Sequence, residues 1–212
     1  MRYFMGPDVW AATVADIDAA GHERVESLAE AEVFVNTASD PAQTPEIPEN
    51  IQWVQYCFTG VNRHIEAGLI RPDGLPWCNS AGAFAKPVAE SALGLMLSQA
   101  HHHKAFALAK SWSVARELDE SQAWLYDQQG PTRVLIVGAG GIGTQLMAYL
   151  RPFGVHITAV NRSGRPVDGA DVTLPIERVD EAWGEADFVV SILPATAATK
   201  AFFDAAVFRA MK

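Results

Sequence analysis

The sequence predicts an α/β protein with two parallel sheets, and three observations support this. Short apolar segments typical of strands alternate with amphipathic segments typical of helices along the whole chain. The apolar segment 133–137 runs directly into Gly138-Ala-Gly-Gly-Ile-Gly143, a glycine pattern that joins a buried strand to a helix. A long helical segment over 86–100 separates the earlier strands from this turn, so each half is expected to build its own sheet.

Composition excludes several classes of protein. The 212 residues suffice for one or two domains, and the formal net charge of −9 argues against binding to nucleic acid or to an anionic membrane surface. No apolar stretch reaches the ~18 residues of a membrane span, and the N-terminus has no signal-peptide core. Cys57 and Cys78 lie in apolar, strand-like contexts, so we expect both to be reduced and buried in a cytoplasmic protein.

In the first half, two helices and five strands are predicted, with a proline-rich surface loop over 39–50. The strands are expected over 2–5, 24–27, 32–36, 51–58 and 75–79, and the helices over 9–20 and 62–67. Ligands of open α/β sheets bind at the carboxyl ends of strands, which draws attention to Thr59 and Gly60 after the fourth strand. A glycine there can expose backbone N–H groups to a carboxylate, or it can simply turn the chain, and both readings remain open.

The segment Lys86–Ala100 predicts a strong helix, with Pro87 in its first turn, which is expected to run on toward Trp112. It is followed by His101-His-His103. Three adjacent residues of a helix point about 100° apart, so they cannot converge on one metal ion. We therefore expect a polar, partly exposed patch and no metal site.

The glycine turn predicts a dinucleotide site, because each glycine has a separate task. Gly138 allows a sharp turn off the strand, Gly140 allows the backbone to approach a pyrophosphate, and Gly143 allows the helix to pack on the sheet. Segments 144–150 and 155–160 then read as a helix and a second apolar strand, the context that this motif requires. The alternative is a glycine-rich turn in an unrelated α/β unit.

The end of that second strand bears on the choice of cofactor. A site selective for NAD carries Asp or Glu there, whereas this chain has Asn161-Arg162-Ser163, with Arg165 nearby. Arg162 can offer a planar charged fork to a 2′-phosphate, so NADP(H) is favoured. NAD(H), with Asn161 on the adenosine ribose, stays open. Further strands are expected over 171–175 and 187–193, and a helix is expected from Thr199 to Lys212.

Five segments together resemble the D-isomer-specific 2-hydroxyacid dehydrogenase family. They are 58–62, 79–90, 137–143, 193–199 and 208–212. The resemblance implies a flavodoxin-like substrate domain over 1–86 and a Rossmann doubly wound NAD(P)-binding domain over 87–212, incomplete at its C-terminus. The tail Asn161-Arg162-Ser163 is most similar to the NADPH-using glyoxylate and hydroxypyruvate reductase branch.

The resemblance further implies hydride transfer between the nicotinamide cofactor and a small 2-keto or 2-hydroxy acid, in a homodimer. Substrate would bind at Thr59 and Gly60. The cofactor would bind at Gly138, Gly140, Gly141, Ile142, Gly143, Asn161, Arg162, Ser163, Leu193, Pro194 and Thr199. The alternative is a non-catalytic, redox-sensing module that binds a dinucleotide.

The family's catalytic arginine, glutamate and histidine are expected beyond Lys212. His22, His64 and His156 do not match the family's histidine, so none of them is assigned that role. The predicted strands fill the first four positions of the order 3-2-1-4-5-6, which makes the apolar fourth strand an edge. We therefore expect these residues to be part of a longer enzyme and to have no turnover by themselves.

Overall fold

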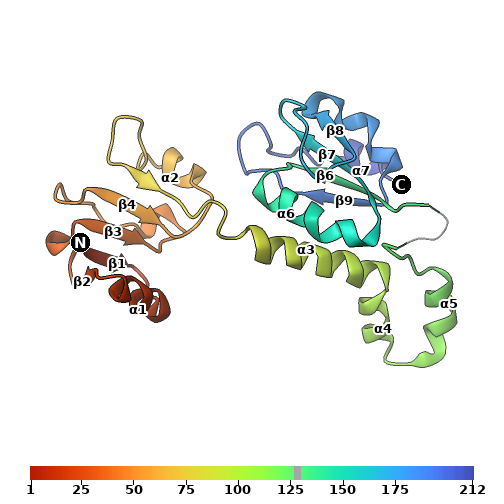
Figure 1. The fold of residues 1–212 in the computed structure, drawn as a ribbon, viewed down its shortest axis with the longest axis horizontal. Helices are drawn as coiled ribbons and strands as arrows, with labels where there is room; N and C mark the ends of the chain where they lie inside the picture. The colour runs from red at the N-terminus through yellow and green to blue at the C-terminus, as the bar shows by residue number, and fades with distance from the viewer. Residues whose placement is uncertain (127–129) are drawn as a thin grey trace. The chain divides into compact units, whose positions relative to one another are not determined.

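A computed structural model describes residues 1–126 and 130–212 and divides the chain into two units, Met1–Ala83 and Phe84–Lys212. Each unit contains one parallel sheet with helices packed on it (Figure 1). The predicted α/β class is confirmed. The expected domain boundary after residue 86 falls in the first turn of the helix that opens the second unit. No helix in the described part of the chain is long and apolar enough to cross a bilayer.

The first unit is built on five parallel strands in the order β2-β1-β3-β4-β5, which is the flavodoxin-like order. The strands are β1 (Arg2–Gly6), β2 (Glu23–Arg24), β3 (Val33–Asn36), β4 (Trp53–Tyr56) and β5 (Trp77–Cys78). The helices are α1 (Ala11–Ala19) and α2 (Asn62–Glu66). All four residues of β3 are buried, as expected for a central parallel strand covered on both faces.

One of the two cysteines departs from expectation. Cys57 is buried beside the core residues Tyr3 and Val35, as predicted, whereas Cys78 is exposed. The prediction for Cys78 was wrong because β5 is a two-residue strand at the edge of the sheet. An apolar sequence context does not reveal which strand is an edge.

His64, in α2, is a buried histidine with an unusual environment. Its side chain is 1% exposed and lies against the rings of Tyr56 and Trp77, at centroid distances of 4.6 and 5.8 Å. Neither ring nitrogen has a hydrogen-bond partner among the described residues. Burial lowers the pKa of His64, and the nearby Ala38 carbonyl opposes this only in part. The folded state therefore favours the neutral ring.

We expect His64 to make the chain less stable in mild acid. The ordinary histidine pKa is about 6.5, so below that pH the unfolded state binds more protons and the free energy of unfolding falls, by up to about 1.4 kcal/mol per pH unit. His64→Phe keeps an aromatic ring and should remove this dependence, whereas His22→Phe, at an exposed site, should retain it. Urea unfolding across this pH range measures the effect, and equal slopes for wild type and His64→Phe would contradict it.

The second unit is built on four parallel strands in the order β8-β7-β6-β9. The strands are β6 (Arg133–Val137), β7 (His156–Asn161), β8 (Val172–Pro175) and β9 (Phe188–Ser191). The α-helices are α3 (Ala85–Ala100), α4 (His103–Ala109), α5 (Ala115–Glu120), α6 (Gly141–Leu150) and α7 (Ala205–Ala210). This strand order matches the first four positions of the doubly wound fold, with β9 at the edge as expected.

Apolar residues on both faces of this sheet explain the burial of β6. Residues of α3 and α6, such as Ala89 and Leu146, pack with Ile136 on one face. Trp183 packs with Leu135 and Val137 on the other. Short 3-10 helices connect the longer elements in both units. They lie at Leu28–Glu30, Pro41–Gln43, Trp112–Val114, Arg151–Phe153, Ile176–Glu181 and Trp183–Glu185.

Two predicted helices are shorter than expected. The helix that was predicted to reach toward Trp112 ends at Ala100, because His102 adopts a left-handed conformation with φ of 52°. The helix predicted from Thr199 to Lys212 is only α7. It begins where the Asp204 carboxylate accepts hydrogen bonds from the N–H groups of Ala206 and Val207, at 2.8 and 2.9 Å.

Candidate functional site

The glycine turn lies where the carboxyl ends of three neighbouring strands meet. The N–H groups of Gly138 and Ala139, just after β6, both donate to the Val160 carbonyl of β7, at 2.9 and 3.1 Å. Gly138 has φ of +97°, and a Cβ on it would lie 2.7 Å from the Ile192 carbonyl oxygen after β9. Only glycine therefore fits at position 138, for reasons of both conformation and space.

The next three glycines of the motif differ in the space around them. A Cβ on Gly140 or Gly141 would meet no atom within 4 Å, whereas a Cβ on Gly143 would lie 3.3 Å from the Ile136 side chain of β6. Helix α6 starts at Gly141, so the N–H groups of its first turn have no acceptor within the helix. Ile142 packs against the core beneath. The shape and the helix dipole fit a pyrophosphate approaching from above the turn.

Alanine substitutions at Gly138 and Gly141 should change the free energy of unfolding by different amounts. Gly138→Ala should lower the free energy of unfolding by about 3 kcal/mol, because it combines a left-handed residue with a backbone clash. Gly141→Ala should leave it nearly unchanged, because the new methyl group enters open space. Urea unfolding of both variants measures the difference, and equal stability for the two would refute the packing described for Gly138.

The turn after β7 is held by its own side chains. The Asn161 amide nitrogen donates to the Arg165 carbonyl at 2.7 Å, and its carbonyl oxygen accepts from the Ser163 N–H at 3.0 Å. The Arg165 guanidinium donates to the Ser163 hydroxyl at 3.2 Å. Asn161 is thus engaged within the turn, and Arg162 is exposed, with no ion pair among the described residues.

The loop after β9 is also organised internally. Leu193 packs on the core around Trp183. The Thr199 hydroxyl donates to the Pro194 carbonyl and accepts from the Thr196 N–H at 2.9 Å, which closes the loop on itself. The structure therefore places Leu193, Pro194 and Thr199 after β9, the neighbour of the strand that enters the glycine turn.

In the first unit, Thr59 and Gly60 follow the carboxyl end of β4 and are exposed. The loop is tied to the segment after β5. The Asn79 side-chain amide donates to the Thr59 carbonyl at 2.8 Å, and the Ser80 N–H donates to the Phe58 carbonyl at 3.1 Å. Gly60 does not have the left-handed φ that would require glycine, and a Cβ on it would meet no atom within 4 Å. Neither conformation nor packing within this unit explains a glycine at position 60.

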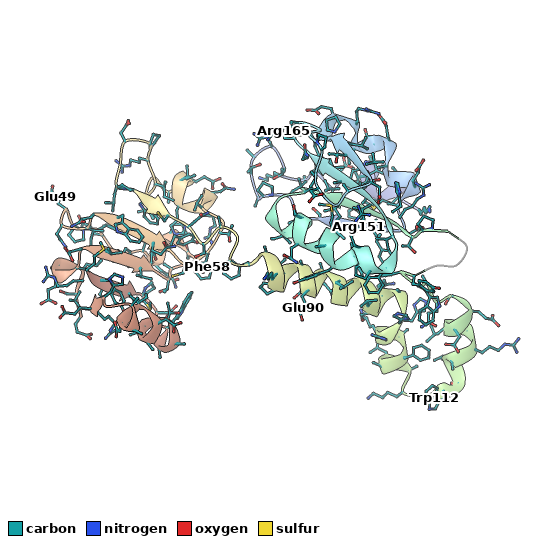
Figure 2. The ribbon with its side chains drawn as sticks, viewed as in Figure 1. Glu49, Phe58, Glu90, Trp112, Arg151 and Arg165 are labelled. Atoms are coloured by element: carbon teal, nitrogen blue, oxygen red, sulfur yellow. The ribbon has the colours of Figure 1, made fainter. Side chains whose placement is uncertain are left out.

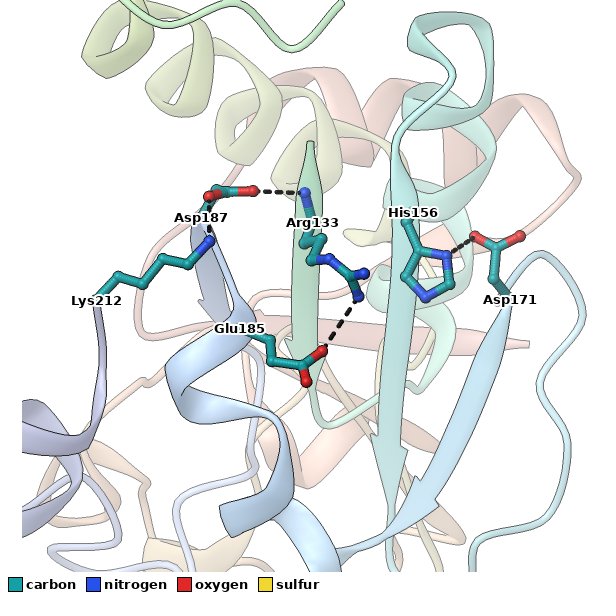
Figure 3. Close-up of polar contacts among 6 residues, drawn as sticks. All are labelled: Arg133, His156, Asp171, Glu185, Asp187 and Lys212. Atoms are coloured by element: carbon teal, nitrogen blue, oxygen red, sulfur yellow. Dashed lines mark hydrogen bonds and ion pairs between the residues drawn. The ribbon is translucent and has the colours of Figure 1, made fainter. Parts of the chain in front are cut away.

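The opposite, amino-terminal edge of the second sheet holds charged pairs (Figure 3). The Asp187 carboxylate accepts from the Arg133 backbone N–H and from the Lys212 ammonium, both at 2.8 Å. Burial alone would raise the pKa of Asp187, but these hydrogen bonds outweigh it and the pKa is lowered. Arg133 in turn pairs with Glu185 at 3.2 Å. These groups hold the strands and lie away from the glycine turn.

Asp171 has a similar role beside β7. Its carboxylate accepts from the Ile157 N–H at 2.7 Å, which lowers the pKa of Asp171, with the Arg151 side chain adding to the effect. His156 lies 3.9 Å from this carboxylate, at the first residue of β7. His22 comes just before β2, also at an amino end, and His64 is buried. His22 and His156 thus lie at amino ends, whereas the buried His64 lies beside Tyr56, the last residue of β4.

The sheet order and the open glycine turn define an α/β protein of the dinucleotide-binding class. Residues 93–212 match the family model for the NAD binding domain of D-isomer specific 2-hydroxyacid dehydrogenases. The chain belongs to the D-isomer specific 2-hydroxyacid dehydrogenase family, which confirms the resemblance found in the sequence.

Among the described residues, no group of three His, Cys, Asp or Glu side chains could hold a metal ion.

Similar proteins extend beyond this chain. An uncharacterized protein in the proB 3′ region of Corynebacterium melassecola is 43% identical over 212 residues, which is 100% of this chain and 68% of that protein. A hydroxypyruvate reductase of Thermotoga maritima is 27% identical over 158 residues, covering 73% of this chain and 48% of that one. The solved structure of an NADPH-dependent glyoxylate/hydroxypyruvate reductase from Sinorhizobium meliloti, in complex with NADP and sulfate, has a TM-score of 0.71 at 19% identity. The match covers 100% of this chain and 68% of the reductase.

Proposed function

We propose that residues 1–212 supply the cofactor site and the substrate-carboxylate loop of an NADP(H)-dependent 2-keto acid reductase. Its substrates would be small, such as glyoxylate or hydroxypyruvate, and the bound cofactor would supply the hydride. The observation that carries the proposal is the open space above Gly140 and Gly141 at the start of α6. There, backbone N–H groups can bind the cofactor pyrophosphate without an intervening side chain.

The preference for NADP(H) is argued from the turn after β7. A 2′-phosphate needs cationic donors and no nearby carboxylate, and this turn offers Arg162 and Arg165, with Asn161 in place of an acidic residue. Because Asn161 bonds to the turn itself, it holds Ser163 and Arg165 in place and leaves Arg162 exposed. Ser163 is expected to add a hydroxyl to the phosphate site.

Replacing Arg162 should change the affinity for one cofactor only. Arg162→Ala should weaken NADPH binding about tenfold or more, since a charge-assisted bond to the phosphate is lost, and should leave NADH binding nearly unchanged. Arg209→Ala, which removes an exposed arginine from α7, is the matched control and should alter neither. Fluorescence titration with both cofactors measures this. Tighter binding of NADH than of NADPH by the wild-type chain would overturn the proposed preference.

For the substrate, we propose that Thr59 and Gly60 bind its carboxylate. The supporting observation is that Gly60 is exposed, has ordinary backbone geometry and is surrounded by open space, so a structural need does not explain it. Hydrogen bonds from Asn79 and Ser80 fix the loop on both sides of Thr59. A fixed loop with exposed N–H groups suits an anionic group that must be held in one orientation.

We expect the 212-residue chain to bind NADPH but not to reduce glyoxylate or hydroxypyruvate. Reduction of the keto group requires a proton donor beside it. His22 and His156 lie at the amino ends of strands, and His64 is buried and so closed to a substrate. Loss of NADPH absorbance with either acid measures turnover, with an active hydroxypyruvate reductase as positive control. Turnover by a preparation of verified mass would show that the proton donor lies within these residues.

Two wider expectations belong to the same proposal. A reductase of small organic acids with reduced cysteines suits the cytoplasm, and we propose that location. We also propose that the protein works as a homodimer.

A further inference from the structure

Residues 57–61 form the loop between β4 and α2 that carries the proposed substrate-binding pair, and Figure 2 labels Phe58 within it. Both ends of this loop contact His64. The His64 backbone N–H donates to the carbonyl of Val61, the last residue of the loop, at 3.0 Å. The His64 ring contacts the ring of Tyr56, the residue just before the loop, with the two centroids 4.6 Å apart. His64 therefore connects the start of the 57–61 loop to its end.

The contact with Tyr56 belongs to a cluster of three rings. The Trp77 ring of β5 lies 5.8 Å from the His64 ring and 6.4 Å from the Tyr56 ring, measured between centroids. Each pair of rings is tilted, with interplanar angles of 54–57°, an arrangement that avoids the unfavourable face-to-face sandwich. Because β4 and β5 are paired strands, the cluster holds α2 against both of them.

Packing alone does not explain a histidine in this cluster. Both ring nitrogens of His64 and the indole nitrogen of Trp77 are buried without a hydrogen-bond partner among the described residues. A buried polar group without a partner lowers stability, and an apolar side chain at position 64 would avoid that cost. What a histidine adds is the ability to gain a proton close to neutral pH.

Charged and titratable groups from three segments face the His64 ring. Burial lowers the pKa of His64, the Ala38 carbonyl after β3 opposes this, and Arg63 of α2 and Asp40 after β3 act in opposite directions. Arg63 and Asp40 pair with each other at 3.1 Å. Tyr56 stays neutral, because burial raises the pKa of its phenol. The ring is therefore neutral while it lies in the cluster.

We propose that His64 positions Thr59 and Gly60 for the substrate carboxylate, and that a proton on the His64 ring releases the 57–61 loop. The proposal rests on the proposed function of this loop. The neutral ring packs against Tyr56 and fixes the start of α2, to which the loop is bonded. A cation cannot stay in the cluster, because no carboxylate among the described residues pairs with this ring.

The direction of the pH effect follows from proton linkage. The released loop exposes the ring to water, where its pKa returns to about 6.5, so the released state binds more protons than the ordered one. Acid therefore favours release, and the loop loses affinity for a 2-keto acid as the pH falls below about 6.5. The substrate does not cause this loss, because a carboxyl group with a pKa of about 3.5 stays ionised in this range.

NMR spectroscopy of the ligand-free chain tests the control of the loop. The backbone order parameters of Thr59 and Gly60 should fall from about 0.85 at pH 7.5 to about 0.6 at pH 5.5, while those of β3 stay high. The fall should follow the ionisation of His64, read from its ring Cε1–H signal. His64→Phe keeps a ring against Tyr56 and should hold the loop ordered at both pH values. His22→Phe, at an exposed site of the same unit, should behave like the wild type.

Titration with glyoxylate, followed through the amide signals of Thr59 and Gly60, tests the effect on binding. The dissociation constant should rise about threefold or more between pH 7.5 and pH 5.5 in the wild type and in His22→Phe, and should stay constant in His64→Phe. His64→Ala removes the ring contact and should weaken binding at both pH values. Restored affinity in His64→Phe at pH 7.5 shows that the ring contact positions the loop.

The outcomes separate this proposal from the proposed function. The role of His64 is overturned if the order of the loop does not change with pH, or if it changes equally in the wild type and in His64→Phe. It is also overturned if glyoxylate affinity has the same pH dependence in both. If the loop responds to pH through His64 but its amide signals do not respond to glyoxylate at either pH, the proposed carboxylate site is wrong and the positioning of the loop by His64 is supported.

Discussion

The second unit depends on the close approach of Gly138 to the peptide between Ile192 and Leu193. The space that a side chain at position 138 would occupy is taken by the backbone that leaves β9. The same residue donates to the Val160 carbonyl of β7, so one position links the ends of three strands. Helix α6 begins three residues later, and its direction follows from this turn. A wider turn would separate the first N–H groups of α6 from the loops after β7 and β9.

The two edges of this sheet have different tasks. Asp187 and Asp171 accept hydrogen bonds from backbone N–H groups at the starts of strands, and they pair with Lys212 and Arg151. The charged groups at this edge therefore stabilise the fold. At the other edge the polar groups of Asn161 and Thr199 close their own loops, and the space above Gly140 stays open. The side chains that stabilise the starts of the strands therefore lie at the edge opposite the glycine turn.

Much of this arrangement could be predicted from the sequence. The strands at 133–137 and 156–161 were predictable because both faces of the sheet are buried, which leaves unbroken apolar runs around the glycine pattern. The break at His102 was not, because a left-handed histidine has no local sequence signature and is selected by the return of the chain at Ala123. The exposure of Cys78 and the engagement of Asn161 with the Arg165 carbonyl likewise depend on contacts that only the folded chain brings together.

The unequal burial of the two cysteines makes Cys78 a selective chemical handle. Burial raises the pKa of the Cys57 thiol and shields it from solvent, whereas the Cys78 thiol is accessible. A maleimide fluorophore would therefore attach at β5 without disturbing the core. The next residue, Asn79, donates to the carbonyl of Thr59, so the fluorophore would sit one residue from a direct contact with that loop. The proposed binding of an acid substrate at Thr59 and Gly60 could then be tested in the native sequence, without introducing a cysteine.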